Sequence, residues 1–165
     1  MHIDNVTVCL SFRYHMFGND VNRLTVFNEL LDMEQIYLWH QRYDHGDVWW
    51  KTEVTINEMR GRILFRVDGG SKPLADVAID DVVLTNDVCS LDTGFAIQPL
   101  PWSCDFEVDF CDVVHDFMDD ADEWRWQIGL SRSRIEGEDT GPCYDATFSN
   151  ASGECVIFMI MIMKR

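Results

Sequence analysis

The chain has 165 residues, of which 47% are hydrophobic and 12% aromatic, and a formal net charge of −16. This composition predicts a folded domain with a core and excludes a disordered tail. The negative charge argues against nucleic acid or an anionic membrane surface as the partner, because both repel an acidic protein. Nine of the 29 acidic residues fall between Asp105 and Glu123, where no Lys or Arg occurs. This stretch predicts a solvated acidic loop or, alternatively, a site for a divalent cation or a basic partner.

Alternation of apolar and polar residues predicts the first two strands. Within residues 9–16 the apolar face consists of Leu10, Phe12, Tyr14 and Met16, and the polar face of Ser11, Arg13 and His15. A period of two is typical of a half-buried strand. Residues 18–20 have the composition of a turn, and residues 23–28 alternate again through Leu24 and Val26. We therefore predict that 10–16 and 24–26 pair as antiparallel neighbours.

Three further strands are predicted before residue 90, at 49–56, 62–67 and 77–84. In the first of these the inward stripe is Trp50, Thr52, Val54 and Ile56. The nearly unbroken apolar run 77–84 indicates a central strand covered on both faces. Residues 28–41 offer a modest helix candidate, although they suit a strand equally well. Short strands between regular turn signals predict an all-β chain, a sandwich or jelly roll of antiparallel strands.

The end of the chain differs from this pattern. Gly94, Pro99 and Pro101 predict a linker over residues 91–103. The last apolar run, 156–163, has eight residues, far fewer than the ~20 that a helix needs to span a bilayer. We interpret it as a buried strand or as a poorly defined end of the gene model.

Six cysteines without a CxxC pair or a zinc-type Cys/His cluster favour disulfides and therefore an oxidising compartment. Composition and spacing alone do not choose among the pairings of six cysteines. Two sequons, at Asn5 and Asn150, agree with a secreted glycoprotein. The first residues have neither a basic nor an apolar signal region, so we expect the signal peptide on a longer parent chain.

Catalytic patterns are lacking. His15, His40, His45 and His115 occur in no HExxH motif, and the chain has no GxSxG motif. Asp105, Glu107 and Asp109 alternate along one strand, so they project to one face and do not flank a glycosidic bond from both sides. We therefore predict a protein that is not an enzyme.

Two cysteine-anchored segments carry a family resemblance. The block 104–111 (CDFEVDFC), followed by 119–124 (DDADEW) and 140–147 (TGPCYDAT), resembles the beginning of a MAM domain, the extracellular adhesion module of meprins, neuropilins and receptor tyrosine phosphatases. The block 9–18 (CLSFRYHMFG), with 24–26, 78–82 and Cys89, resembles the end of one. The end comes first. We therefore predict a C-terminal half of one module at 1–90, a linker at 91–103 and an N-terminal half at 104–165.

Two origins account for this order. The chain is either cut from a tandem array of repeats or is one module with its halves exchanged. We expect a cut array as the origin and a single circularly permuted sandwich as the folded outcome, because the termini of such domains are often close. The linker is long enough for this join, at up to ~3.5 Å per residue.

The resemblance also implies a disulfide framework. It pairs Cys9 with Cys89 and Cys104 with Cys111, and it implies a jelly-roll β-sandwich. Cys143 and Cys155 lie outside this set and form either a third bridge or two unpaired thiols. The position where the family usually has aspartate-histidine-threonine reads Asp-Ala-Thr at 145–147, which departs from the pattern.

No cofactor is required, but modules of this type often hold a structural Ca²⁺ or Na⁺ where the terminal strands meet. The carboxylates we assign to such a site are Glu107, Asp80 and Asp81, since calcium prefers hard oxygen ligands. The alternative is that Glu107 pairs near the sheet edge while Asp80 and Asp81 bond to loop amides.

The resemblance implies a non-catalytic extracellular module for adhesion or assembly, within a larger membrane-anchored or secreted protein. Its partner would be another protein or a second copy, and the sequence identifies neither that partner nor the parent protein. The alternative is a carbohydrate-binding jelly roll, in which exposed Trp39, Trp49 or Trp102 stacks on sugar rings.

Overall fold

The computed structural model describes residues 6–19, 21–69, 76–86, 88–89, 99–111, 123–128, 140–142, 144, 146–147 and 154–159. For residues 69, 99–102, 123–128 and 154–159 it describes the backbone alone.

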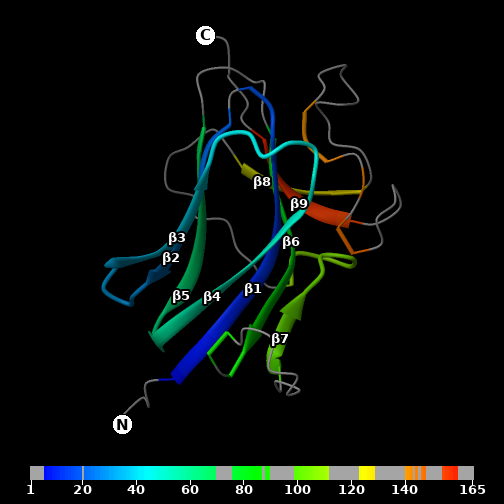
Figure 1. Ribbon diagram of the computed structural model, residues 1–165. Helices are drawn as coiled ribbons and strands as arrows, with labels where there is room; N and C mark the ends of the chain where they lie inside the picture. Colours follow the sequence, from blue (N-terminus) through cyan, green and yellow to red (C-terminus); the bar gives the residue numbers. More distant parts are fainter. Residues whose placement is uncertain are drawn as a thin grey trace.

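Nine strands in this part of the chain form two antiparallel sheets (Figure 1). They are β1 (Val6–Phe17), β2 (Val21–Glu29), β3 (Gln35–Arg42), β4 (Trp50–Met59), β5 (Arg62–Gly69), β6 (Asp76–Thr85), β7 (Pro99–Cys104), β8 (Glu123–Ile128) and β9 (Glu154–Met159). The larger sheet has six strands in the order β4-β1-β6-β9-β8, with β7 also paired to β6, and the smaller sheet has the order β3-β2-β5. The described residues contain no helix. The all-β sandwich prediction is confirmed.

The first two strands lie in different sheets. β1 pairs with β4 and β6, whereas β2 pairs with β3 and β5. The predicted pairing of 10–16 with 24–26 is therefore wrong. The connection between Phe17 and Val21 carries the chain from one sheet to the other, and Gly18 within it has a φ of 126°, a conformation that glycine adopts without strain. Both strands alternate because each faces the same core from an opposite side.

The core lies between the two sheets. Phe12 of β1 packs edge-on against Trp39 of β3, at 5.3 Å between ring centroids, and against Phe65 of β5, at 5.1 Å. The buried cluster consists of Val8, Leu10, Phe12, Tyr14, Met16, Val21, Leu24, Val26, Ile56, Val77, Ile79, Val82, Cys104 and Phe106. The predicted apolar face of β1 is thus confirmed as a core face. Burial of these side chains is the main favourable term for this fold.

The inward stripe of β4 is buried only at one end. Ile56 is 1% exposed, whereas Trp50 is 46% exposed. β4 is the edge strand of its sheet, so one of its two edges has no neighbouring strand.

β6 is the central strand of the larger sheet, and all of its residues from Asp76 to Asp80 are buried. This confirms the strand predicted to be covered on both faces. One edge of β6 pairs with β1, and its other edge pairs with β9 and β7.

The strands after residue 98 complete the larger sheet. β7 pairs with β6 at Val82↔Cys104, and β9 pairs with β6 at Val77↔Phe158. β8 joins through β9. Residues 99–103 of the predicted linker thus belong to a strand, and residues 156–159 of the terminal apolar run do so as well. The two predicted halves contribute to one sheet.

The described residues include no helix that is long and apolar enough to cross a membrane.

Candidate functional site

Two disulfides anchor the two halves of the chain separately. Cys9 is bonded to Cys89, and Cys104 to Cys111, as the family resemblance implied. The first bond joins β1 to the segment that follows β6. Glu53 lies beside these two sulfurs, but bonded sulfurs offer no thiolate to a metal. This cluster is therefore structural.

Asp80 and Asp81, two of the three aspartates of β6, each bond to at least one donor on another segment. Asp80 is fully buried, and its oxygens accept hydrogen bonds from the backbone N–H groups of Asp81, at 2.7 Å, and Ala146, at 3.3 Å. Asp81 forms an ion pair with Nε of Arg13 at 2.8 Å and accepts a bond from the hydroxyl of Thr147, also at 2.8 Å. Asp81 has a φ of 49° at a register shift between β1 and β6, and such bulges re-aim a side chain. The alternative expected for these residues was bonding to loop amides: Asp80 accepts from the amide of Ala146, whereas the described bonds of Asp81 are to the side chains of Arg13 and Thr147.

The loop after β7 is closed by two aspartate side chains. Oδ1 of Asp105 accepts from the backbone N–H of Glu107 at 3.2 Å, and Oδ1 of Asp109 accepts from that of Cys111 at 2.7 Å. Phe106, between them, is 1% exposed and anchors the loop in the core. These turns are the reason that the acidic block is a loop rather than the alternating strand of the sequence analysis.

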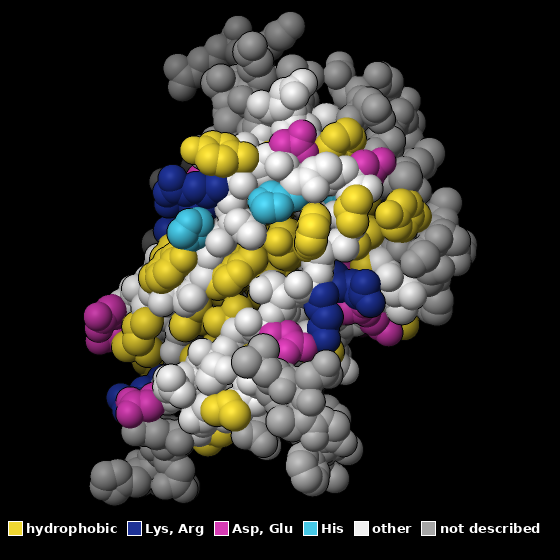
Figure 2. All heavy atoms as spheres, viewed as in Figure 1, with side chains coloured by type: hydrophobic (Ala, Val, Ile, Leu, Met, Phe, Trp, Pro, Cys, Tyr) yellow, Lys and Arg dark blue, Asp and Glu magenta, His cyan; other side chains and the backbone are white. Residues whose placement is uncertain are grey.

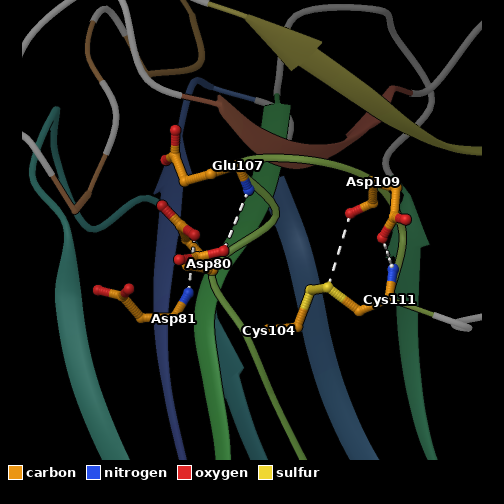
Figure 3. Close-up of a disulfide and its surroundings, with 7 residues drawn as sticks. Asp80, Asp81, Cys104, Glu107, Asp109 and Cys111 are labelled. Atoms are coloured by element: carbon orange, nitrogen blue, oxygen red, sulfur yellow. Dashed lines mark hydrogen bonds between the residues drawn. A yellow bond between two sulfur atoms is a disulfide. The ribbon is translucent and has the colours of Figure 1, made fainter.

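Figure 3 shows how the predicted cation ligands lie. Glu107 projects on the side of its loop where Asp80 and Asp81 lie, whereas Asp109 lies beside the disulfide. Carboxylate oxygens suit Ca²⁺, but a cation here would share Asp80 and Asp81 with their protein donors. A Ca²⁺ or Na⁺ site at Glu107, Asp80 and Asp81 stays a prediction.

The segment 140–147 bonds to both β4 and β6. Nε1 of Trp49, just before β4, donates to the carbonyl oxygen of Tyr144 at 2.9 Å. The hydroxyl of Thr140 donates to Oδ2 of Asp76 at 3.4 Å. Together with the bonds to Asp80 and Asp81, these contacts dock a segment of the predicted N-terminal half (104–165) on the predicted C-terminal half (1–90).

A buried histidine lies beside this contact. His15 is 1% exposed, with its ring centroid 5.5 Å from that of Trp49 and its Nε2 3.1 Å from Oδ1 of Asp47. Alternation placed His15 on the polar face of β1, and the structure covers that face with the loop before β4. No local sequence signal predicts this, because the covering residues are 32 positions away.

Two of the three tryptophans chosen for sugar stacking, Trp39 and Trp49, are engaged in packing. Trp39 is only partly exposed and packs against Phe12 and Tyr14 of the core, so the expectation that it is an exposed platform is wrong. Trp49 is half-buried and donates a hydrogen bond to the carbonyl oxygen of Tyr144. The side chain of Trp102 lies outside the described residues. The most exposed tryptophan among the described side chains is Trp50, which sequence reasoning placed inward.

Apolar side chains reach the surface along the free edges of both sheets. Ile36 and Tyr37 of β3 are 44% and 53% exposed. Figure 2 shows a diagonal band of apolar side chains across one face of the molecule, with charged groups of both signs beside it. Contiguous apolar surface with a polar rim is typical of contact surfaces.

The outer face of the smaller sheet carries a set of polar residues that sequence reasoning missed. Strand register arranges the residues of this face in four rows, three of them polar: Arg42–Arg23–Asp68, His40–Thr25–Arg66, Tyr37–Phe27–Leu64 and Gln35–Glu29–Arg62. The Arg66 guanidinium lies 4.9 Å from the centroid of the Phe27 ring and donates to Oε1 of Gln35 at 2.8 Å. The i, i+2 spacing of polar residues along β5 indicates a polar strand face and can be seen in the sequence. The register that brings the three strands together cannot be read from the sequence.

Glu29 lies at the centre of one row and is 2% exposed. Nε2 of Gln35 donates to its Oε1 at 2.9 Å, and Nε of Arg62 donates to its Oε2. These bonds, first that of Gln35 and then that of Arg62, lower the pKa of the Glu29 carboxyl. Glu29 is therefore ionised and fixes one arginine of the face.

Three predicted modification sites and bridge residues, Asn5, Asn150 and Cys143, lie outside the described residues, as does the side chain of Cys155. Glycosylation and a third disulfide therefore stay predictions.

The family comparison covers the part of the chain that forms most of the sandwich. Residues 2–90 match the MAM family (MAM domain, meprin/A5/mu). The chain belongs to the MAM domain family. The match ends at residue 90, so the resemblance of 104–147 to the start of a MAM module stays a prediction.

Known MAM proteins are similar to about half of the chain. The chain is 33% identical over 84 residues to MAM domain-containing protein 2 of Mus musculus, covering 50% of this chain and 12% of that protein. It is 38% identical over 79 residues to MAM and fibronectin type III domain-containing protein 1 of Acropora millepora, covering 48% and 17%. It is 33% identical over 84 residues to MAM domain-containing glycosylphosphatidylinositol anchor protein 1 of Rattus norvegicus, covering 49% and 9%. The chain thus spans less than a fifth of the length of each of these MAM proteins.

Proposed function

We propose that this chain is a non-catalytic extracellular interaction module that contributes adhesion or assembly to a larger membrane-anchored or secreted protein. The match of residues 2–90 to the MAM family carries this proposal. The two disulfides support an oxidising compartment. A relative named as a glycosylphosphatidylinositol anchor protein supports a place at the cell surface.

We also propose that the chain works as one permuted module. The pairing of β7 and β9 with β6 supports this, because β9 comes from the predicted N-terminal half and β7 leads from the predicted linker into it. The bonds of Tyr144, Ala146 and Thr147 to the other half support it further. Each disulfide in the described part of the chain closes within its own half, so the described contacts between the halves are non-covalent.

The contact surface of the module would use its exposed sheet edges and outer sheet face. Exposed apolar side chains on β3 and β4 support this role. The carbohydrate-binding alternative has less support, since Trp39 packs against the core and Trp49 is hydrogen-bonded to the carbonyl oxygen of Tyr144.

Bead adhesion tests the function. Beads coated with the folded chain should adhere to one another or to a cell monolayer, and beads coated with the reduced and alkylated chain should not. Equal adhesion of both preparations in both assays would contradict the proposal. Saturable binding on a glycan array that Trp49→Ala abolishes would instead support the carbohydrate-binding alternative.

A further inference from the structure

The outer face of the smaller sheet differs in charge from the rest of the chain. Its four rows contain four arginines, at 23, 42, 62 and 66, and no lysine, against two carboxylates, Glu29 and Asp68. This gives a formal excess of two positive charges on a chain whose net charge is −16. Such segregation of charge is typical of a surface that selects its partner by electrostatic complementarity.

All of this excess lies in two neighbouring rows of the face. One row has Arg42 and Arg23 with Asp68, and the next row has Arg66 with two uncharged residues when its histidine is neutral. Rows that are two residues apart along a strand are separated by about 7 Å. The other two rows have no net charge, because one is uncharged and Glu29 balances the arginine of the other. Three guanidinium groups are therefore gathered at one end of the face.

These three guanidinium groups are accessible. Arg42 and Arg66 are exposed, and within the described part of the chain neither forms an ion pair with a carboxylate. Arg23 pairs with Asp68, and its side chain is still 39% exposed. Arg66 is held over the Phe27 ring, at 4.9 Å from the centroid. A side chain that is already fixed loses less conformational entropy when it binds a ligand.

An exposed aromatic ring borders the two charged rows. Tyr37 belongs to the next row and is 53% exposed, and its hydroxyl is hydrogen-bonded to Nδ1 of His40. An aromatic ring offers an apolar face on which a sugar ring stacks. The planar fork of a guanidinium group matches pairs of oxygen atoms on an anionic group such as sulfate. The face thus combines groups that suit the two parts of an anionic sugar.

We propose that Arg23, Arg42 and Arg66, with Tyr37 beside them, bind a sulfated polysaccharide of the cell surface or the extracellular matrix. The inference rests on the extracellular place given in the proposed function and adds a partner of a second chemical class. It differs from the carbohydrate-binding alternative, in which tryptophans stack on the sugar. The Tyr37 ring favours a glycan over an acidic peptide, because a peptide carboxylate uses the arginines alone.

The net charge of −16 does not prevent this contact. Interactions between exposed charges are largely screened beyond about 8 Å at physiological ionic strength. A bound glycan is therefore affected mainly by the groups that it contacts, and on these two rows positive charge is in excess. Repulsion by the rest of the chain slows the approach of a polyanion and disfavours its binding elsewhere on the molecule.

Surface plasmon resonance of the full chain over immobilised heparin, at about 0.15 M NaCl, tests the proposal. We expect saturable binding that is at least about tenfold weaker in Arg42→Gln/Arg66→Gln, because two charge-assisted contacts are lost. Lys51→Gln/Arg60→Gln is the matched control and should bind like wild type. It removes the same charge from two residues outside these rows, each paired with a glutamate of β4. Thermal unfolding verifies that both variants are folded.

Two further probes test the chemistry of the ligand on the wild-type chain. Heparin from which the sulfate groups have been removed should bind at least about tenfold more weakly, since the arginines then lose their anionic partners. Polyglutamate should also bind at least about tenfold more weakly than heparin, because it has no sugar ring to stack on Tyr37.

Several results would overturn the proposal. They are the absence of saturable heparin binding at about 100 μM protein, equal binding by the arginine variant and its control, and undiminished binding of desulfated heparin. Polyglutamate that binds as tightly as heparin would assign the face to an acidic protein segment instead. Adhesion of coated beads measures the proposed function separately: beads that adhere while heparin fails to bind leave that function intact, and beads that do not adhere contradict it whatever the heparin result.

Discussion

The indole N–H of Trp49 donates to the carbonyl oxygen of Tyr144 at 2.9 Å and so joins two residues that lie 95 positions apart in the chain. Trp49 precedes β4 in the region that matches the MAM family, and Tyr144 lies beyond that region. Because no described disulfide crosses between the halves, bonds of this kind decide whether they stay together.

Replacing Trp49 with Phe should weaken this junction while keeping an aromatic ring beside His15. We expect a loss of about 1 kcal/mol in the free energy of unfolding, the usual net value of one hydrogen bond. Trp50→Phe is the matched control, because Nε1 of Trp50 bonds at 3.3 Å within its own half, to the carbonyl of His45. Proteolysis around residue 144, followed by mass spectrometry, should be faster in Trp49→Phe alone. Equal rates in the two variants would contradict the role assigned to this bond.

The stability of the protein should fall in acid partly through Glu29. Its pKa is lowered in the folded state by Gln35 and Arg62, so its contribution is present above the unfolded pKa of about 4.3 and is lost as the pH falls through the lower folded value. Glu29→Gln should therefore flatten the decrease in unfolding free energy below about pH 4. Chemical denaturation at a series of pH values measures this. Glu53→Gln, on the exposed pair with Lys51, makes the same substitution on the larger sheet and is the matched control.

The two disulfides should differ in their contribution to stability. Cys9–Cys89 has a sequence separation of 80 and Cys104–Cys111 one of 7. The chain-entropy relation gives about 4.5 kcal/mol for the long loop and about 2.5 kcal/mol for the short one. Urea unfolding of Cys9→Ala/Cys89→Ala and of Cys104→Ala/Cys111→Ala should show this order. A larger loss for the short loop would mean that packing of the 105–111 loop, rather than chain entropy, dominates.

A cation at Glu107, Asp80 and Asp81 should appear as stabilisation by calcium. Extracellular modules bind Ca²⁺ with a Kd of roughly 1 mM or tighter, so about 10 mM CaCl₂ should add at least about 1.4 kcal/mol and raise Tm by about 3 °C. Glu107→Gln should remove this shift. Asp109→Asn, which lies beside the disulfide instead (Figure 3), should keep it. An unchanged Tm in wild type, or the same increase in Tm in Glu107→Gln, would contradict a cation site at Glu107, Asp80 and Asp81.

The sequence predicts the strands better than their pairing. The buried face of β1 and the burial of β6 on both faces are predicted correctly, because buried positions are occupied mainly by apolar residue types. The pairing of β1 with β2 is misjudged because alternation tells which residues face the core and not which sheet a strand joins. The turn after Phe17 therefore looks like a hairpin, although it crosses between sheets.

The candidate site residues also divide into those that could be predicted from the sequence and those that depend on how distant segments pack. Cys9, Cys89, Cys104 and Cys111 pair as the family resemblance implied. The burial of His15, by contrast, depends on contacts far along the chain and has no local signal. The arginine face is missed for a similar reason, since its rows exist only once β2, β3 and β5 are in register.

Cleavage of the linker tests the central claim, that both halves fold as one sandwich, most directly. A specific protease site placed between residues 91 and 98 leaves each described disulfide within its own fragment. We predict that the cleaved chain elutes from a sizing column as one species of about the intact 19.2 kDa, with both fragments present and an unfolding transition like that of the uncut chain. Elution as two separate folded fragments would contradict the claim.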